Sequence, residues 1–375
     1  MVPEGWQRRT LGEVTELQRG FDLPASQREP GLYPIISSSG RSGTHSEPRV
    51  KGPGIVTGRY GSIGEVFYVE EDHWPLNTSL WVRDFHGNDK RFAYYFLQTV
   101  DFEKYSDKTS VPGVNRNDLH RISALVPPLA EQKKIADILS TWDAAIETNE
   151  NLLANAEAQK RALMGQLLTG KRRLKGYEGS TWPDVELGQM GELISGLTYS
   201  PSDVVKDGQG LLVLRSSNVQ GGSISLVDTV YVNLKLPENK LTRFGDVLIC
   251  VRNGSRNLIG KAAKISKETT GVAHGAFMAL FRPTEPEFAY QLICSAVFRR
   301  HVSQNLGATI NSINGSDLRK FVFAYPPSAE RNKISEILST ADDELQSLRR
   351  QLELLKVEKA ALMRELLTGK RRVTV

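Results

Sequence analysis

The chain has 375 residues, 39% of them hydrophobic and 24% charged, which is typical of globular proteins and enough for two or three domains. No apolar run approaches the roughly 18 residues that a membrane span needs, and MVPEGWQRRT lacks a signal-peptide core. The net charge of +5 suits a polyanionic partner without requiring one. Cys250 and Cys294 lie in apolar runs, as free thiols do in a reducing compartment, so we expect a cytoplasmic protein with no membrane partner.

Residues 1–126 predict a first β-rich domain. Short apolar runs at 33–40, 52–69, 79–85 and 122–128 are separated by glycines and prolines, as strands and turns are. A helical pattern interrupts them at 91–100. We therefore expect an α+β domain.

Residues 127–170 predict one long helix. Seam positions from Ile135 to Leu167 are spaced alternately by four and three residues, which is the pattern of a coiled coil. From Glu131 to Leu168 this helix spans about 57 Å, at roughly 1.5 Å per residue. Gly170 and the basic residues after it suit a helix C-terminus, and residues 171–181 form a linker.

Residues 182–325 predict a second domain that repeats the first in diverged form. An offset of 176 (182 − 6) matches Trp6, Leu11-Gly12 and Gly20 to Trp182, Leu187-Gly188 and Gly196. Strand-like runs follow at 210–218, 245–255, 260–265, 275–283 and 321–327, with a helical pattern at 287–302. We expect the same topology as in the first domain.

Residues 326–369 repeat the long helix, and a tail follows at 370–375. The segments 127–173 and 326–372 align without a gap at an offset of 199 (366 − 167). About half of their residues are identical, from the opening Pro-Pro to the closing LLTGKRR. A coiled-coil seam this long needs a partner helix, and each copy supplies one for the other.

Connectivity predicts how the helices pair. The second domain follows the first helix after a short linker, so the second helix must run back along the first. The sequence thus predicts an α+β fold: two β-rich domains of like topology joined by two long antiparallel coiled-coil helices. This arrangement is pseudo-circular and pseudo-two-fold about a point near Asn151 and Arg350.

Two features of the helices allow two interpretations each. The polar seam residues Asn149, Lys160 and Lys359 either fix the helix register or extend to solvent from the edge of the seam. The Lys-Arg-Arg that closes each copy either complements the helix C-terminus or contacts a phosphate.

Motifs of catalysis are missing. The sequence has no G-x-x-x-x-G-K-[ST] phosphate loop, and neither Pro-Pro pair follows the Asn or Asp of a methyltransferase tetrapeptide. His45 and His274 have no triad-type partner, and no Cys/His spacing is typical of a metal site. We therefore expect a non-catalytic protein with no cofactor or metal of its own.

Both domains instead carry loops rich in Arg, Asn, Ser, Thr and Tyr at equivalent places. Arginine pairs with guanine, asparagine with adenine, and serine or threonine with either, and all of them also hold phosphates. Such loops are often plain turns, but matching sets in two repeated domains favour DNA binding. The candidates are Ser38, Ser39, Arg41, Arg59, Tyr60, Ser62, Asn77, Thr78, Lys108, Thr109, Ser110, Asn115, Arg116, Arg215, Ser216, Asn218, Arg252, Asn253, Ser255, Arg256, Asn257, His274, Thr309, Asn311, Ser312 and Asn314.

The whole chain resembles the specificity subunit of type I restriction–modification systems. The resemblance is carried by the two domain openings at Trp6 and Trp182, by PPLAEQKKIADILS with PPSAERNKISEILS, and by both copies of LLTGKRR. Arg331 departs from the pattern, because the family has a glutamine there, which Gln132 keeps. Recognition domains vary within that family, so the resemblance assigns no base-reading residue.

This resemblance implies a subunit without catalytic activity. Each domain is expected to bind one half of an asymmetric, bipartite double-stranded DNA target, and the helix pair is expected to set the gap. Two modification subunits that use S-adenosylmethionine would methylate an adenine on each strand. Two restriction subunits that use ATP and Mg would translocate and cleave the DNA.

Two other functions stay open. A standalone two-domain DNA-binding protein needs no methyltransferase partner. Against it, apolar residues outside the seam favour further helices from partner subunits: Ile138, Leu152, Met164, Ile337, Leu354 and Met363. A fragment of a fused nuclease–methyltransferase is disfavoured by the missing motifs.

Overall fold

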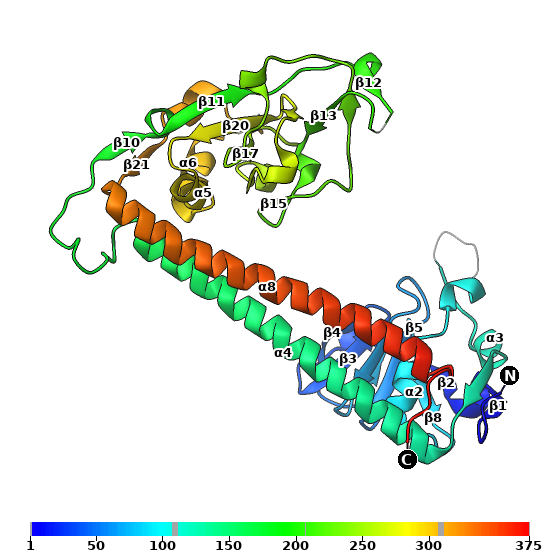
Figure 1. The fold of residues 1–375 in the computed structure, drawn as a ribbon. Helices are drawn as coiled ribbons and strands as arrows, with labels where there is room; N and C mark the ends of the chain where they lie inside the picture. The colour runs from blue at the N-terminus through cyan, green and yellow to red at the C-terminus, as the bar shows by residue number, and fades with distance from the viewer. Residues whose placement is uncertain (1, 107–111, 207, 307–310, 375) are drawn as a thin grey trace. The chain divides into compact units, whose positions relative to one another are not determined.

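The computed structural model describes residues 2–106, 112–206, 208–306 and 311–374. Its internal contacts divide the chain into unit 1, Met1–Asn151 with Arg350–Val375, and unit 2, Leu152–Arg349. Each unit holds one globular domain and a part of each long helix (Figure 1). The predicted α+β fold class is confirmed.

Two small sheets form the globular domain of unit 1. The first is antiparallel and contains, in spatial order, β2 (Glu16–Arg19), β8 (Ser79–Asp84), β5 (Gly54–Gly58) and β6 (Val66–Val69). The second contains β4 (Gly40–His45), β3 (Tyr33–Ser37) and β7 (Trp74–Pro75), with β3 and β7 parallel. The start and end of the domain are joined by the pair β1 (Gln7–Thr10) and β9 (Ser123–Val126).

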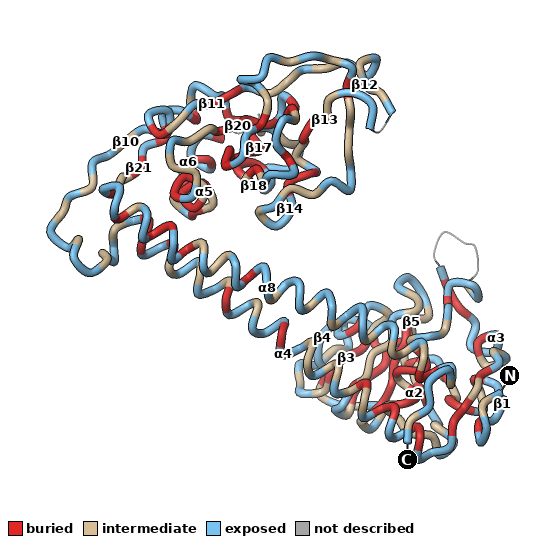
Figure 2. Tube along the Cα trace, in the orientation of Figure 1, coloured by how far each residue is buried: buried red, intermediate tan, exposed pale blue. Residues whose placement is uncertain are grey.

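Helix α2 (Lys90–Leu97) packs on the first sheet and builds much of the core of unit 1. Asp89 caps it, because its carboxylate accepts a hydrogen bond from the Phe92 amide at 2.9 Å. Phe92, Tyr95 and Leu97 are fully buried, each contributing roughly 1.5–3 kcal/mol. Figure 2 shows buried segments where α2 meets the strands.

The globular domain of unit 2 repeats this plan. Its antiparallel sheet contains β11 (Gly191–Ser195), β20 (Met278–Pro283), β17 (Val247–Cys250) and β18 (Ala262–Lys264). Its second sheet contains β12 (Val204–Val205), β16 (Tyr231–Val232), β13 (Leu211–Leu214) and β19 (Ala273–His274). β13 and β19 are parallel, as β3 and β7 are, and β10 (Asp184–Glu186) pairs with β21 (Val322–Ala324) as β1 pairs with β9. The prediction of like topology is confirmed.

The prediction of a single helix at 287–302 is wrong, because the structure has two helices there. α5 (Pro286–Ile293) ends before Cys294, and α6 (Ala296–Asn305) begins after Ser295. The Ser295 hydroxyl accepts a hydrogen bond from the Phe298 amide at 3.2 Å and donates one to the Leu292 carbonyl at 2.6 Å. It therefore caps the second helix and ends the first, which the continuous apolar pattern hides.

The long helices are α4 (Leu129–Leu167) and α8 (Ser328–Leu366), close to their predicted bounds. Gly170 and Gly369 follow them with φ of +67° and +71°, the left-handed conformation that favours glycine at a helix C-terminus. No helix in the described part of the chain is long and apolar enough to cross a membrane.

The seam lysines are ion-paired inside each unit. In unit 1, Lys359 binds Asp143, which also accepts a hydrogen bond from the Tyr95 hydroxyl at 2.5 Å. In unit 2, Lys160 binds Asp342, which also accepts one from the Gln291 amide at 2.7 Å. The lysine side chains are only 15% and 11% exposed, so the register interpretation is favoured over extension to solvent. Asn149 is buried, but its side-chain oxygen has no partner in the described chain.

The last arginine of each LLTGKRR copy forms an ion pair with a buried glutamate. In unit 2, Arg173 donates to Glu330 at 2.8 and 3.0 Å, and the Trp182 indole donates to the same carboxylate at 3.0 Å. In unit 1, Arg372 and Trp6 surround Glu131 in the same way. Each of these arginines therefore helps to attach a domain to the N-terminal turn of a long helix. Neither a helix C-terminal charge nor a phosphate contact, the two roles suggested by the sequence, describes this contact.

Candidate nucleic-acid interface

Three of the predicted loops converge at one end of the first sheet of unit 1. The amides of Arg59 and Tyr60 both donate to the Thr78 carbonyl, at 2.9 and 3.1 Å. The Arg59 carbonyl accepts from the Val114 amide at 3.0 Å, and the Gly61 amide donates to the Pro112 carbonyl at 3.0 Å. The backbone thus joins the segments 59–61, 76–79 and 112–116 into one surface.

Arginines gather on this surface. A pocket of about 350 Å³ is lined by Arg19, Arg59, Tyr60, Leu80, Gly113, Val114, Asn115 and Arg116. The Arg59 guanidinium lies 4.5 Å from the centroid of the Tyr60 ring, which is 44% exposed. A guanidinium on an exposed ring is a stacking and hydrogen-bonding element suited to nucleobases.

The domain of unit 2 builds the same scaffold from different side chains. The amides of Val251 and Arg252 both donate to the Phe277 carbonyl, at 3.0 and 3.1 Å, and the Ile313 amide donates to the Val251 carbonyl at 2.9 Å. By these bonds Val251 corresponds to Arg59, Arg252 to Tyr60, Phe277 to Thr78 and Ile313 to Val114. The two surfaces are structural equivalents.

The side chains of the second surface are partly aromatic and apolar. The Arg252 guanidinium lies 5.6 Å from the centroid of the Phe277 ring, which is 56% exposed. The Asn253 amide donates to the Ser216 hydroxyl at 2.8 Å, and the Asn311 amide donates to the Gly254 carbonyl at 3.1 Å. These bonds bring predicted residues from three loops together.

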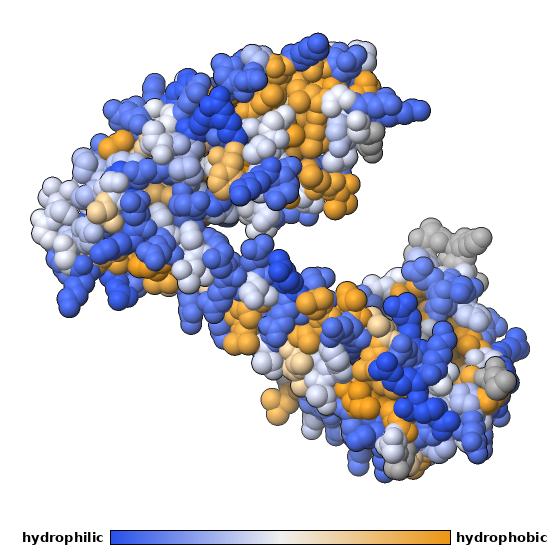
Figure 3. All heavy atoms as spheres, in the orientation of Figure 1, coloured by the Kyte–Doolittle hydropathy of each residue, from blue (hydrophilic) through white to orange (hydrophobic). Residues whose placement is uncertain are grey.

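A cleft of about 650 Å³ adjoins this second surface. Its lining consists of Leu197, Thr198, Tyr199, Pro201, Val204, Arg215, Ser216, Ser217, Val230, Gly275, Ala276, Phe277 and Met278. Figure 3 shows hydrophobic side chains gathered on the face of this domain that carries β12 and β13. Arg215 pairs with Asp228 at 2.7 Å, but its Nε is buried with no partner among the described residues.

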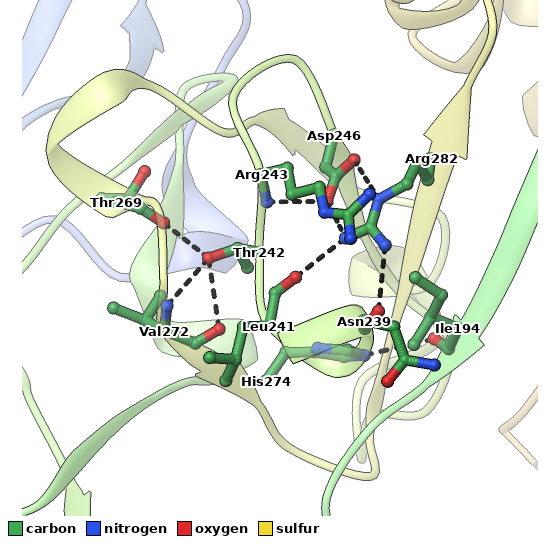
Figure 4. A network of polar contacts seen from close by, with 10 residues as sticks. All are labelled: Ile194, Asn239, Leu241, Thr242, Arg243, Asp246, Thr269, Val272, His274 and Arg282. Atoms are coloured by element: carbon green, nitrogen blue, oxygen red, sulfur yellow. Dashed lines mark hydrogen bonds and ion pairs between the residues drawn. The ribbon is translucent and has the colours of Figure 1, made fainter. Parts of the chain in front are cut away.

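Two predicted DNA contacts are corrected, because the structure buries them. His274 is only 2% exposed, and its Nε2 contacts the Ile194 carbonyl at 3.2 Å in the polar network of Figure 4. Asn218 is also buried, where its amide donates to the carbonyls of Ser225 and Asp228. Both are polar residues in turn-rich segments, and the sequence alone did not distinguish a turn-forming role from a binding one.

The remaining candidates lie around the two surfaces or outside the described chain. Arg41 pairs with exposed Glu71 at 2.7 Å, Asn77 binds Asp22, and Arg256 donates to the Leu306 carbonyl at 3.3 Å. Lys108, Thr109, Ser110 and Thr309 lie outside the described residues. The other candidates flank the converging loops, and these are Ser38, Ser39, Ser62, Ser255, Asn257, Ser312 and Asn314.

Sequence reasoning missed two residues of these surfaces, Arg19 and Phe277. Arg19 is the last residue of β2, and Phe277 lies directly before β20. Arg19 stands next to Gly20, which the repeat matches to Gly196. The sequence criterion of polar loops passed over strand ends such as Arg19 and aromatic residues such as Phe277. An exposed aromatic beside a basic loop was the available signal.

A family model described as the type I restriction modification DNA specificity domain matches residues 3–158 and 179–356. The MjaVIII type I restriction enzyme specificity subunit of Methanocaldococcus jannaschii is 27% identical to this chain, covering 99% of it and 94% of the relative. The EcoKI specificity subunit of Escherichia coli is 28% identical over 46% of this chain and 38% of the relative. The crystal structure of the S subunit from M. genitalium has the same fold, with a TM-score of 0.66 at 18% identity, over 100% of this chain and 97% of that one.

Proposed function

Because this chain belongs to the family of type I restriction modification DNA specificity domains, we propose that its two domains bind the two halves of a bipartite DNA target. The observation that carries the proposal is the repeated three-segment scaffold, which presents a candidate surface once in each unit. A protein with two such surfaces joined covalently binds the second half-site at a high effective concentration.

The proposed target is asymmetric. The two scaffolds share their backbone hydrogen bonds but differ in side chains at matched positions, with Arg59 in one and Val251 in the other. Base edges are distinguished by side-chain chemistry rather than by the backbone. Two different half-sites are therefore expected.

The proposed role is a scaffold without catalytic activity or a cofactor of its own. Two modification subunits with S-adenosylmethionine would methylate adenines, and two restriction subunits with ATP and Mg would cleave DNA. Support for helical partners comes from apolar side chains left exposed on the long helices, namely Leu354 and Val357 in unit 1 and Leu152 and Ile337 in unit 2. Three residues named with them from the sequence are not exposed: Met164 is buried in the core of unit 2, and Ile138 and Met363 are half-buried against the core of unit 1.

Adenine methylation mapped across a genome tests the proposal. Cells that express the chain with its modification subunits should gain methylated adenines in one bipartite, asymmetric motif, and cells lacking the chain should not. Arg59→Ala should relax discrimination in one half of the motif and Arg252→Ala in the other. A short continuous palindrome, or methylation unchanged without the chain, would contradict it.

A further inference from the structure

The three arginines of the unit 1 pocket have no arginine at the equivalent positions of unit 2. Arg19 pairs with Leu80 across the sheet, and its equivalent Ser195 pairs with Ala279. Arg59 corresponds to Val251 through their matching amide and carbonyl bonds. Arg116 follows Asn115 at the start of α3 (Arg116–His120), where Gly315 follows Asn314 at the start of α7 (Gly315–Arg319). The cationic pocket therefore belongs to one domain alone.

The apolar cleft is likewise found in one domain only, that of unit 2. Phe277 and Met278, which form part of its wall, correspond to Thr78 and Ser79 in unit 1. Leu197 corresponds to Phe21, because Leu197 pairs with Gly275 directly after β19 and Phe21 pairs with Leu76 directly after β7. The next residue is Thr198 in unit 2 and Asp22 in unit 1. Asp22 binds Arg19 and Asn77, so the region of unit 1 that corresponds to the cleft is polar.

Charge separates the two sites further. None of the described residues that line the unit 1 pocket has a carboxylate, while three have guanidinium groups. Arg215 is the one charged residue among those lining the unit 2 cleft, and its buried Nε lacks a partner in the described chain. A donor left unsatisfied beside apolar walls suits an occupant that is largely apolar with an acceptor at one edge.

We infer that the two domains read their half-sites by different chemistry, the first by arginine hydrogen bonds to guanine and the second by apolar contact with thymine. Guanine presents two acceptors, O6 and N7, to a guanidinium, and the arginines of the pocket supply the donors. Thymine presents a C5-methyl group and the O4 acceptor in the major groove. The methyl group matches the exposed Phe277 ring, and O4 matches the Arg215 donor. This inference rests on the proposed function.

The test measures binding of the full-length chain to DNA duplexes that contain the motif identified by methylation mapping. Each thymine is replaced by deoxyuridine, which removes only the methyl, and each guanine by 7-deazaguanine, which removes only the N7 acceptor. Deoxyuridine should weaken binding roughly threefold to fourfold per methyl in one half-site. 7-Deazaguanine should weaken it about tenfold in the other half-site.

Variants assign each effect to its domain. Phe277→Ala should abolish sensitivity to deoxyuridine, while Phe244→Ala, which removes an exposed phenylalanine outside the cleft lining, should leave it intact. Arg19→Ala with Arg59→Ala should abolish the 7-deazaguanine effect and leave the deoxyuridine effect unchanged. Because all of these side chains are at least partly exposed, the variants should fold, and the melting temperature checks this.

Several outcomes would overturn the inference. Equal sensitivity of both half-sites to both analogues would show one chemistry rather than two. If the arginine variants lower only the salt dependence of binding, with no 7-deazaguanine effect in the wild-type chain, the pocket holds phosphates instead. Failure of the unmodified chain to bind the motif at all would count against the proposed function, whereas specific binding without these analogue effects would sink the inference alone.

Discussion

Arg372 donates two hydrogen bonds to Glu131, at 2.5 and 3.0 Å, across 241 positions of sequence. The same carboxylate accepts the Trp6 indole at 3.2 Å, so residues from the two ends of the sequence share one acceptor. In unit 2 the corresponding Arg173 and Trp182 come from one short stretch of chain and share Glu330. In unit 2 the linker joins Arg173 to Trp182 covalently. In unit 1 the Arg372–Glu131 ion pair connects the tail to the first domain instead, as the predicted pseudo-circular order requires.

Arg372→Met should loosen unit 1 and leave unit 2 unchanged. The substitution leaves the mostly buried Glu131 carboxylate with fewer donors, which is costly for a buried charge. Hydrogen exchange should accelerate in β1 and at the start of α4. Arg173→Met is the matched control and should accelerate exchange around Trp182 instead. Equal changes in both units for either variant would contradict this assignment.

Tyr95→Phe should destabilise unit 1 by about 1–2 kcal/mol, because it removes a hydrogen bond to a charged carboxylate. The Tyr95 hydroxyl is the contact by which α2 binds Asp143 and, through it, Lys359. Urea unfolding measures the loss, and Tyr105→Phe, at an exposed tyrosine, serves as the control. An unchanged unfolding free energy for Tyr95→Phe would show that this network contributes nothing.

Unit 2 should lose stability as the pH falls below about 6.5. Burial lowers the pKa of His274 below its usual range. The unfolded chain therefore takes up a proton that the folded domain excludes, so the contribution is present above the unfolded pKa and is lost as pH falls toward the folded one. Between about pH 7.5 and about pH 5.5, His274→Gln should flatten the fall in unfolding free energy.

His301→Gln is the control for the pH experiment, since it removes the other described histidine of unit 2. His274 would be ruled out as the source of the pH dependence if the plot of unfolding free energy against pH for His274→Gln still paralleled the wild type. Equal flattening of that plot by both variants would rule it out as well.

Ser295→Ala should destabilise unit 2 by about 1 kcal/mol, as the loss of a helix N-cap does. The hydroxyl is buried and bonds the end of α5 and the start of α6. Ser303→Ala, at an exposed position within α6, should have little effect on the same denaturation curve. Similar losses for both variants would mean that residue 295 is not acting as a cap.

The sequence was most informative where a pattern extends over many residues. The 4-3 spacing and the offset of 199 predicted α4 and α8, because a long periodic pattern is hard to produce by chance. The offset of 176 predicted the repeated domain. The break at Ser295 was missed, since one hydroxyl decides it against an apolar pattern that continues on both sides. Local capping outweighed periodicity there.

The candidate site was less predictable, because it depends on contacts between distant segments. Polar composition found Arg59, Tyr60 and Thr78, which the backbone does bring together. It also selected His274, whose burial follows from a sheet position that no local pattern reveals. Phe277 was missed for the opposite reason, since an apolar residue before a strand is normally interior, and this one is exposed.

The recognition scaffold is made of main-chain bonds, and this has an evolutionary consequence. The amides and carbonyls of residues 59, 60, 78 and 114, and of 251, 252, 277 and 313, hold the loops without using a side chain. Natural variants can therefore replace an arginine by a valine, or a threonine by a phenylalanine, while the loops keep their course. A single substitution at one of these positions changes the side chain that the loop presents and removes none of these main-chain bonds.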